Sequence, residues 1–393
     1  MRWMRPHPGD QLKMATVCNE LVILSYRKWQ DDTHKGALMN SQASTPSTRQ
    51  PLSPPRQRVR RRARVVALSL TLTACAASTL TAAPAWAAGG YTLTATIRVG
   101  QYPIGVAVSP DGKHAYVANE NVPGSVSVID TATDHVTTTI AVGSDPYWVA
   151  VSPDGTRAYV TNLASRSVSV IDTATNHVTG TFAIPSGEPL GVAVSPDGKL
   201  AYVVSAGNPR VFVIDTATGQ VTATIPVGVN PDKVAVSPNG KLAYVTQNGY
   251  PGSVSVINTA TNHVISTITV GSSPQGVAFS PRGALAYVTN LYSRTVSVID
   301  TATNQVTATI HVGQRPIGVA FSPDGARAYI TQNDYPSFTP GGSVSVIDTA
   351  ARRVTAAVRR LCYPWGVAVS PSGTHIYVTN SMARGTVSVI TSR

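Results

Sequence analysis

Short runs of alternating apolar and polar residues fill the chain from residue 91 onward. Stretches of five to eight residues rich in Val, Ile and Thr repeat with a period of two, as in SVSVID at 125–130 and HVTTTIAV at 135–142. This alternation is typical of β-strands. Turn sequences such as SPDG at 109–112 separate the runs, because Pro presets the second turn position and Gly accepts a left-handed conformation. The pattern predicts an all-β structure.

The strand pattern recurs seven times. Its most regular marker is a tyrosine in AYV or a close variant, at Tyr116, Tyr159, Tyr202, Tyr244, Tyr287, Tyr329 and Tyr377. Successive markers lie 42 to 48 residues apart, a period that indicates a solenoid or a propeller. Each copy contains four strands, and so small a sheet buries both faces only against its neighbours. We predict a seven-bladed β-propeller of four-stranded antiparallel blades over 91–393.

The way the ring closes depends on the strand at 91–99, which precedes the first inner strand and resembles the outer strand at 306–312. If this strand joins the last blade, the two ends of the segment share one sheet and latch the ring. If each copy is its own blade, no latch exists. We favour the latch, because it places the strands rich in Gly and Ala, such as 103–108, at the crowded centre.

The repeated GVAVSPDGKxAYVTN followed by SVSVIDTAT resembles the YVTN-repeat propellers of exported bacterial and archaeal surface proteins. The likeness covers 91–393 almost end to end, with full YVTN at 159–162, 287–290 and 377–380. Departures from the motif occur at Ala118, Val204, Ser205, Gln247 and Gln332. The resemblance implies a seven-bladed propeller in a secreted or cell-surface setting, and it implies no catalytic residue.

The segment at 59–87 has the parts of a secretory signal. Basic residues at 56–64 precede an uncharged apolar stretch at 65–83, and an A-x-A site ends at Ala87. Two alternatives are a membrane-spanning anchor and a lipoprotein, because LTAC at 72–75 resembles a lipoprotein box that would place a lipid on Cys75. The small residues before Ala87 favour cleavage. We therefore expect a secreted or cell-surface protein that meets the membrane only through this segment or a lipid anchor.

Residues 1–58 show no sustained period, and 40–58 are rich in Ser, Thr, Pro, Gln and Arg. This composition predicts a disordered extension, and we hypothesise that translation begins near Val59. Of three cysteines, Cys18 and Cys75 precede the repeats and Cys362 lies within them. No intramolecular disulfide is therefore expected in the propeller.

The formal charge of +12 is concentrated at the N-terminus. Residues 1–87 hold 13 Lys and Arg against 4 Asp and Glu, whereas 88–393 hold 18 against 15. A nearly neutral propeller does not indicate a groove that neutralises a phosphate backbone. Nucleic acid is accordingly not an expected partner.

Alternating strand directions would give the ring two different ends. The SPDG and DTAT-type turns share one, here named the turn end, which is nearly identical in all copies. We expect its aspartates to bond their own turns, because their spacing lacks the pattern of a calcium loop. These are Asp130, Asp172, Asp215, Asp300 and Asp348. The loops that lead into each inner strand and those between second and third strands share the other end, named the loop end.

The loop end varies between copies, and recognition in repeat proteins resides where loops vary. Trp148 and Trp365 follow the prolines that start two inner strands. Adding Tyr102, Tyr147 and Tyr363 gives an aromatic sector, and the remaining copies offer Glu188, Asn230, Asp232, Lys233, Gln275 and Arg315. A channel mouth with an aromatic and a polar side is a candidate site for a sugar or peptide. The alternative is that these side chains plug the channel. An insertion at 332–342 with Tyr335 and Phe338 lies at the same end.

Two function classes follow. The first is a monomeric, non-catalytic scaffold outside the cell that binds a protein or glycan without cofactor or metal. The alternative is an enzyme, either a lactonase-like hydrolase or a quinoprotein-type accessory subunit, which needs convergent His, Asp or Glu groups. Three of the six histidines in the repeats occupy equivalent turn positions, and GxSxG, CxxC and HExxH are absent from the sequence. Cys362 is either a reactive thiol or a buried one.

Overall fold

A computed structural model describes residues 90–333 and 341–392. The chain divides into two units, 1–84 and 85–393, and all described residues belong to the second. The predicted extension at 1–58, the signal segment at 59–87 with Cys75, and the side chains of Tyr335 and Phe338 lie outside the described residues. The described part contains 28 strands and no helix. It therefore has no helix long and apolar enough to cross a membrane.

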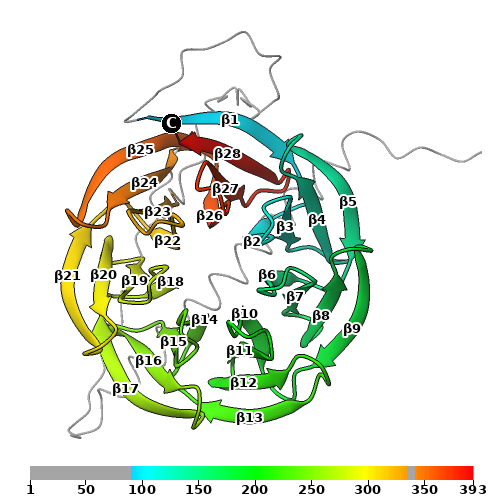
Figure 1. The fold of residues 1–393 in the computed structure, drawn as a ribbon, viewed down its shortest axis with the longest axis horizontal. Helices are drawn as coiled ribbons and strands as arrows, with labels where there is room; N and C mark the ends of the chain where they lie inside the picture. Colours follow the sequence, from blue (N-terminus) through cyan, green and yellow to red (C-terminus); the bar gives the residue numbers. More distant parts are fainter. Residues whose placement is uncertain (1–89, 334–340, 393) are drawn as a thin grey trace, which may run out of the picture. The chain divides into compact units, whose positions relative to one another are not determined.

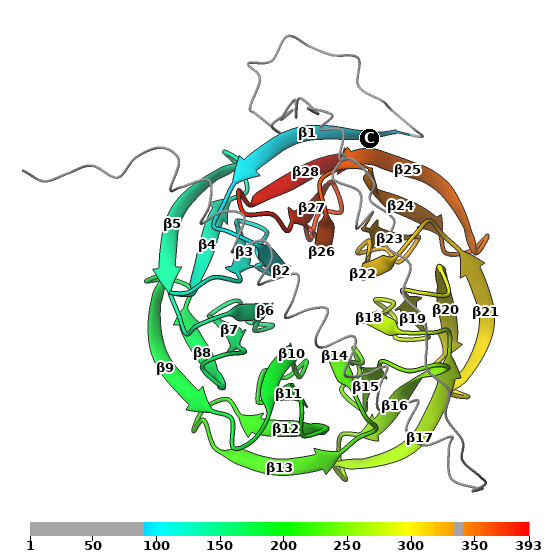
Figure 2. The same ribbon diagram turned by 180° about the vertical axis from the view of Figure 1, so that it is seen from behind.

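Seven four-stranded antiparallel sheets surround a central axis, as Figure 1 shows and the reverse view in Figure 2 confirms. Blade 1 consists of β2 (Pro103–Val108), β3 (His114–Asn119), β4 (Ser125–Asp130) and β5 (His135–Ala141). Blade 2 consists of β6 (Pro146–Val151), β7 (Arg157–Asn162), β8 (Ser167–Asp172) and β9 (His177–Ala183). Blade 3 consists of β10 (Glu188–Val194), β11 (Leu200–Ala206), β12 (Arg210–Asp215) and β13 (Val221–Pro226).

Blade 4 consists of β14 (Pro231–Val236), β15 (Leu242–Gln247), β16 (Gly252–Asn258) and β17 (His263–Val270). Blade 5 consists of β18 (Pro274–Phe279), β19 (Leu285–Asn290), β20 (Thr295–Asp300) and β21 (Gln305–His311). Blade 6 consists of β22 (Pro316–Phe321), β23 (Arg327–Gln332), β24 (Gly342–Asp348) and β25 (Arg353–Leu361). The first strand named in each blade is innermost in Figure 1.

The ring closes by the predicted latch. Blade 7 contains β26 (Pro364–Val369), β27 (His375–Asn380) and β28 (Thr386–Ser392), and its outer strand is β1 (Tyr91–Arg98). β1 pairs antiparallel with β28 from Tyr91 opposite Ser392 to Arg98 opposite Thr386. The two ends of the propeller segment thus meet in one sheet (Figure 1), which pairs what would otherwise be the open edge of β28.

The hydrophobic core lies between the blades. The described residues form seven buried clusters, and each draws side chains from two neighbouring blades. Tyr116 of blade 1, for example, is fully buried with Val128 against Val149 and Val160 of blade 2. All seven marker tyrosines are buried in this way. A single blade therefore has no core of its own, and stability depends on the closed ring.

The threonine of the YVTN motif links adjacent blades. Thr289 Oγ accepts a hydrogen bond from the Gly276 amide (2.8 Å) and donates one to the Ile317 carbonyl of the next blade (2.6 Å). The donors that make the same inter-blade bond are Thr161, Thr246, Thr331 and Thr379. The equivalent positions in blades 1 and 3 are Ala118 and Val204, which have no hydroxyl.

In six blades the last motif position is Asn or Gln and bonds the third strand of the same blade. In blade 3 it is Ser205, which donates to the Ser186 carbonyl (2.8 Å) instead. Asn162 Nδ2 donates hydrogen bonds to Ser167 Oγ (3.1 Å) and Ser169 Oγ (2.9 Å) on the third strand. Gln332 Nε2 reaches Ser345 Oγ at 2.7 Å in the same manner, and Gln247 also bonds its third strand, through Ser255. Glutamine thus preserves the contact where it replaces asparagine.

The two ends of the ring differ as predicted. At the turn end, Thr131 of the third–outer turn donates its amide to Lys113 of the inner–second turn (3.0 Å). Asp130 Oδ1 accepts the amides of Ala132 (3.0 Å) and Thr133 (2.8 Å), and bonds from Thr133 hold the pKa of Asp130 below its usual value. The other four turn aspartates also accept amides of their own turns. At this end, the carboxylates therefore stabilise turns.

We predict that deleting residues 91–99 destabilises the whole ring and not one blade, because Tyr91 and Ile97 are buried between blades. Thermal unfolding followed by circular dichroism should show one transition at a lower temperature. Ile97→Ala alone should cost about 2–5 kcal/mol of unfolding free energy. Leu93→Ala is the control, because Leu93 is 42% exposed. Loss of only a local signal, with an unchanged midpoint, would contradict the latch.

A second prediction concerns the inter-blade hydroxyl. Thr289→Val keeps the side-chain shape but leaves the Gly276 amide and the Ile317 carbonyl without this partner. The variant should lose about 1–3 kcal/mol in urea unfolding. Thr309 lies on the exposed face of the outer strand β21. The unfolding free energy of Thr309→Val should therefore equal that of the unmodified protein within experimental error. Equal stability of the two variants would show that the hydroxyl link contributes nothing.

Candidate functional site

The loops that lead into the inner strands share an unusual backbone conformation. The residue before the inner-strand proline has a left-handed φ between 46° and 53° in six blades, at Tyr102, Asp145, Asn230, Ser273, Arg315 and Tyr363. A non-glycine residue in this conformation costs about 1–2 kcal/mol. The carbonyl of this residue accepts a hydrogen bond from the amide of the residue that follows the second strand. In blade 1, for example, the Glu120 amide donates to the Tyr102 carbonyl (3.0 Å). Backbone hydrogen bonds therefore hold the channel mouth in place against local strain.

The second residue after the inner-strand proline determines how much side chain projects into the channel. It is glycine in five blades, and a Cβ atom at Gly276 would lie 2.5 Å from the Ile317 carbonyl oxygen. Blades 2 and 4 carry Trp148 and Lys233 instead. In both cases the preceding blade is one that lacks the linking threonine. The neighbouring inner strands are also farther apart there. A Cβ atom at Gly105 or Gly191 would lie 3.1 or 2.9 Å from the nearest carbonyl oxygen of the next inner strand, whereas the corresponding distance is 2.4–2.6 Å at the other three glycines.

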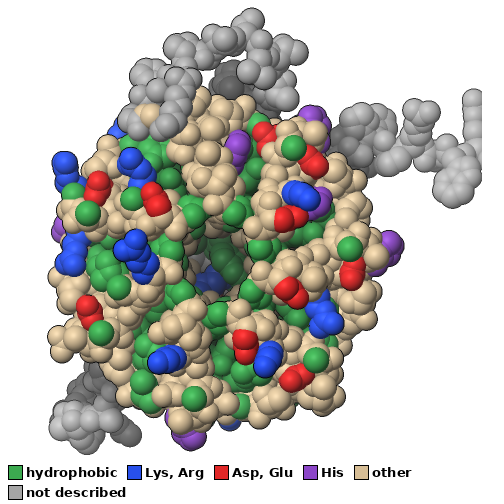
Figure 3. All heavy atoms as spheres, viewed as in Figure 1, with side chains coloured by type: hydrophobic (Ala, Val, Ile, Leu, Met, Phe, Trp, Pro, Cys, Tyr) green, Lys and Arg blue, Asp and Glu red, His purple; other side chains and the backbone are tan. Residues whose placement is uncertain are grey.

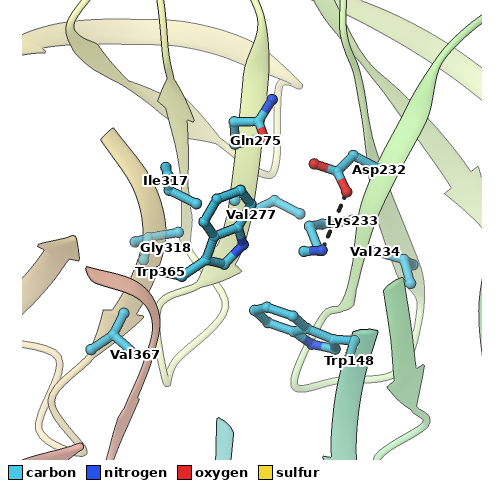
Figure 4. A pocket seen from close by; sticks show the side chains of 12 residues that line it. Trp148, Asp232, Lys233, Val234, Gln275, Val277, Ile317, Gly318, Trp365 and Val367 are labelled. Atoms are coloured by element: carbon cyan, nitrogen blue, oxygen red, sulfur yellow. Dashed lines mark hydrogen bonds and ion pairs between the residues drawn. The ribbon is translucent and has the colours of Figure 1, made fainter. Parts of the chain in front are cut away.

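Lys233 crosses the mouth from blade 4 to blade 2. Its Nζ lies 3.2 Å from Asp232 Oδ1 and 4.3 Å from the centre of the Trp148 ring (Figure 4). It also lies 3.9 Å from the centre of the Tyr147 ring. Lys233 and Asp232 are both buried. Burial lowers the pKa of Lys233, while the Asp232 charge opposes this shift. The predicted aromatic and polar sides thus meet around one ammonium group.

A cavity of about 70 Å³ adjoins this contact. Trp148 and Trp365 flank it from blades 2 and 7, and Asp232, Lys233 and Gln275 supply polar groups (Figure 4). The remaining wall is apolar, including Ile317 and Val367. Figure 3 shows the ring from the face on which Asp, Glu and His side chains gather; its centre is hollowed, with hydrophobic and basic side chains in the depth. The space is large enough for a few water molecules or a small ligand group.

The cavity unites some of the predicted site residues and leaves others out. The predicted residues that do not line it are Tyr102, Tyr147, Glu188, Asn230, Arg315 and Tyr363. Gln275 lines it but is buried, and its Nε2 donates to Asn248 Oδ1 at 3.0 Å. The side chains therefore fill part of the channel, as in the plug alternative, but a cavity remains between the two indoles.

Glu120 is a charged neighbour that the sequence interpretation missed. Burial, and to a smaller extent the Asp145 charge, raise the pKa of Glu120 to about 7, and the Lys233 charge opposes the shift. The only available signal was that Glu120 is the sole ionisable residue at its repeat position, where Leu163 and Leu291 stand in other blades. An acid that titrates near neutrality beside Lys233 makes the charge at the mouth depend on pH.

The other candidate groups, the histidines and Cys362, do not line the cavity. His135, His177 and His263 each contact a threonine carbonyl of their own turn, at the turn end. In the described ranges no group of three or more His, Cys, Asp or Glu side chains is placed to hold a metal ion. Cys362 is half-buried and forms no disulfide.

Comparisons with known proteins identify the fold more clearly than the ligand. A family model described as a choice-of-anchor I domain matches residues 84–231, less than half of the chain. Among curated protein sequences none matches significantly. Many solved structures are similar. One, hydrazine synthase of Kuenenia stuttgartiensis, has a TM-score of 0.66 and 25% identity over 75% of this chain and 97% of its own.

The pKa of Glu120 predicts how stability depends on pH. An unfolded chain releases this proton near the ordinary value of 4.5, whereas the folded ring keeps it until about 7. The folded state binds more protons in this window, so its stability should fall as pH rises from about 4.5 to 7. Glu120→Gln should weaken this fall in urea unfolding across the window, and Glu188→Gln should keep it. Parallel profiles for the unmodified protein and Glu120→Gln would refute the assignment.

Proposed function

We propose that the protein is an exported propeller at the cell surface that binds a protein or glycan through its loop end, around the channel mouth. The match to a choice-of-anchor I domain supports a surface setting. The predicted signal at 59–87 and the resemblance to YVTN-repeat propellers of surface proteins support export.

The observation that carries the proposal is the difference between the two ends. At the turn end, repeated carboxylates accept amides of their own turns. At the loop end, two indoles and a charged pair from three blades surround a cavity. Aromatic groups beside a few fixed polar groups are typical of sites that recognise ligands. The loop end is therefore the favoured binding surface.

Binding to glycan and peptide arrays tests this assignment. Trp148→Ala and Trp365→Ala should each lower the affinity for a detected ligand at least tenfold, because aromatic side chains buried by the ligand dominate binding energy. Lys113→Ala is the control, since its ammonium group lies at the turn end and pairs only with exposed Asp111, at 3.9 Å. Melting temperatures show whether each variant is folded. A ligand whose affinity is insensitive to both tryptophans would exclude this mouth as the binding site.

The same protein preparation separates binding from catalysis. The solved relative carries the name of an enzyme, hydrazine synthase, so a lactone panel and metal analysis belong in the experiment. Turnover that is lost in Lys233→Met or Asp232→Asn would favour the enzyme alternative over a scaffold.

A further inference from the structure

The two ends of the ring differ in charge, and this difference indicates which class of ligand the loop end binds in the proposed function. Among described residues, the turn end holds 8 Lys and Arg against 10 Asp and Glu. The loop end holds nine basic residues, Arg98, Arg166, Arg210, Lys233, Arg294, Arg315, Arg359, Arg360 and Arg384. Its four acidic residues are Glu120, Asp145, Glu188 and Asp232. The positive charge of the propeller is therefore concentrated where recognition is proposed.

An aromatic platform lies on this basic end, apart from the axial cavity. Tyr250 follows the second strand of blade 4 and Tyr292 that of blade 5, and their rings stack with centroids 5.5 Å apart at 23°. Tyr250 is 58% exposed. Aromatic side chains are usually buried more deeply. An exposed ring that stacks on a second ring presents a flat surface to a ligand.

Backbone hydrogen bonds hold the two rings in register. The Ser273 amide donates to Gly249 O (2.9 Å), and the Leu291 amide donates to Ser273 O (2.9 Å). The loop that leads into blade 5 therefore joins the residue before Tyr250 to the residue before Tyr292. The platform is fixed before any ligand arrives, which lowers the entropic cost of binding.

Arg315 places a positive charge beside the platform. Its guanidinium carbon lies 5.8 Å from the centre of the Tyr292 ring. The backbone of Arg315 is held by the Asn333 amide, which donates to its carbonyl at 3.1 Å. A guanidinium binds carboxylates through two parallel hydrogen bonds. The two rings and the cation come from three different blades, so the arrangement exists only in the folded propeller.

We propose that Tyr250, Tyr292 and Arg315 bind an acidic glycan, with a sugar ring stacked on Tyr250 and a carboxylate of the same or the next sugar paired with Arg315. The C–H groups on a sugar face carry slight positive charge and complement the negative face of an aromatic ring. An acidic glycan carries one charge per sugar or disaccharide, which matches nine dispersed basic groups. A nucleic acid has a denser line of phosphates and needs a continuous basic groove.

Calorimetric titration with defined polymers tests the inference, which rests on the proposed function. The probes are polygalacturonate oligomers, neutral dextran oligomers and single-stranded DNA. We expect binding of polygalacturonate that weakens with salt, and no binding of dextran. Tyr250→Ala and Arg315→Gln should each lower the affinity for polygalacturonate at least tenfold. Tyr250→Phe should retain this affinity because the aromatic ring remains. Arg282→Gln at the turn end and Ile265→Ala on an outer strand should stay within twofold.

Each other result has a distinct meaning. Equal affinity for dextran, tighter binding of DNA or no binding of polygalacturonate would overturn the acidic glycan. Acidic-glycan binding that survives Tyr250→Ala and Arg315→Gln would overturn the platform. If that binding is lost only in Trp148→Ala or Trp365→Ala, the ligand lies at the axial mouth, so the proposed function stands and the platform fails.

Discussion

The close approach of neighbouring inner strands is the constraint on which the rest of the propeller depends. A Cβ atom at Gly318 or Gly366 would lie 2.6 or 2.4 Å from a carbonyl oxygen of the next blade. Threonine hydroxyls link the same strands, as from Thr379 to the Ile104 carbonyl across the latched blade. Because no blade has a core of its own, these contacts and the clusters between blades must all form together. The blades therefore keep the same backbone structure even where their sequences differ.

The candidate site arises where this constraint is relaxed. Ala118 and Val204 lack the hydroxyl, and the inner strand that follows each of them carries a large side chain, Trp148 or Lys233, in place of glycine. Those two side chains meet over the channel at 4.3 Å. A buried ion pair such as Lys233 with Asp232 is weak support for stability, because desolvation offsets most of its attraction. The pair, which lines the cavity together with Gln275, therefore fits the proposed binding surface better than a role in stability.

The loop end combines rigidity with variety, and both follow from the backbone. Left-handed residues before the inner prolines are held by hydrogen bonds to the second strands, so the attached side chains vary without moving the frame. The axial cavity and the Tyr250 platform are two products of the same frame at different radii. One is small, enclosed and internally neutralised. The other is open and basic, and the two surfaces suit different parts of one ligand or different ligands.

The architecture could be predicted from the amino-acid sequence, because the period near 43 residues, the strand alternation and the extra strand at 91–99 allow few other arrangements. It also identified the turn aspartates, whose partners are two or three residues away. Which loop-end residues contact one another became clear from the folded ring. Lys233 and Tyr147 are 86 positions apart, and Tyr250 and Tyr292 belong to different blades. Their contacts depend on ring curvature and side-chain reach, which a repeat pattern does not encode, and the same is true of the burial that moves the pKa of Glu120.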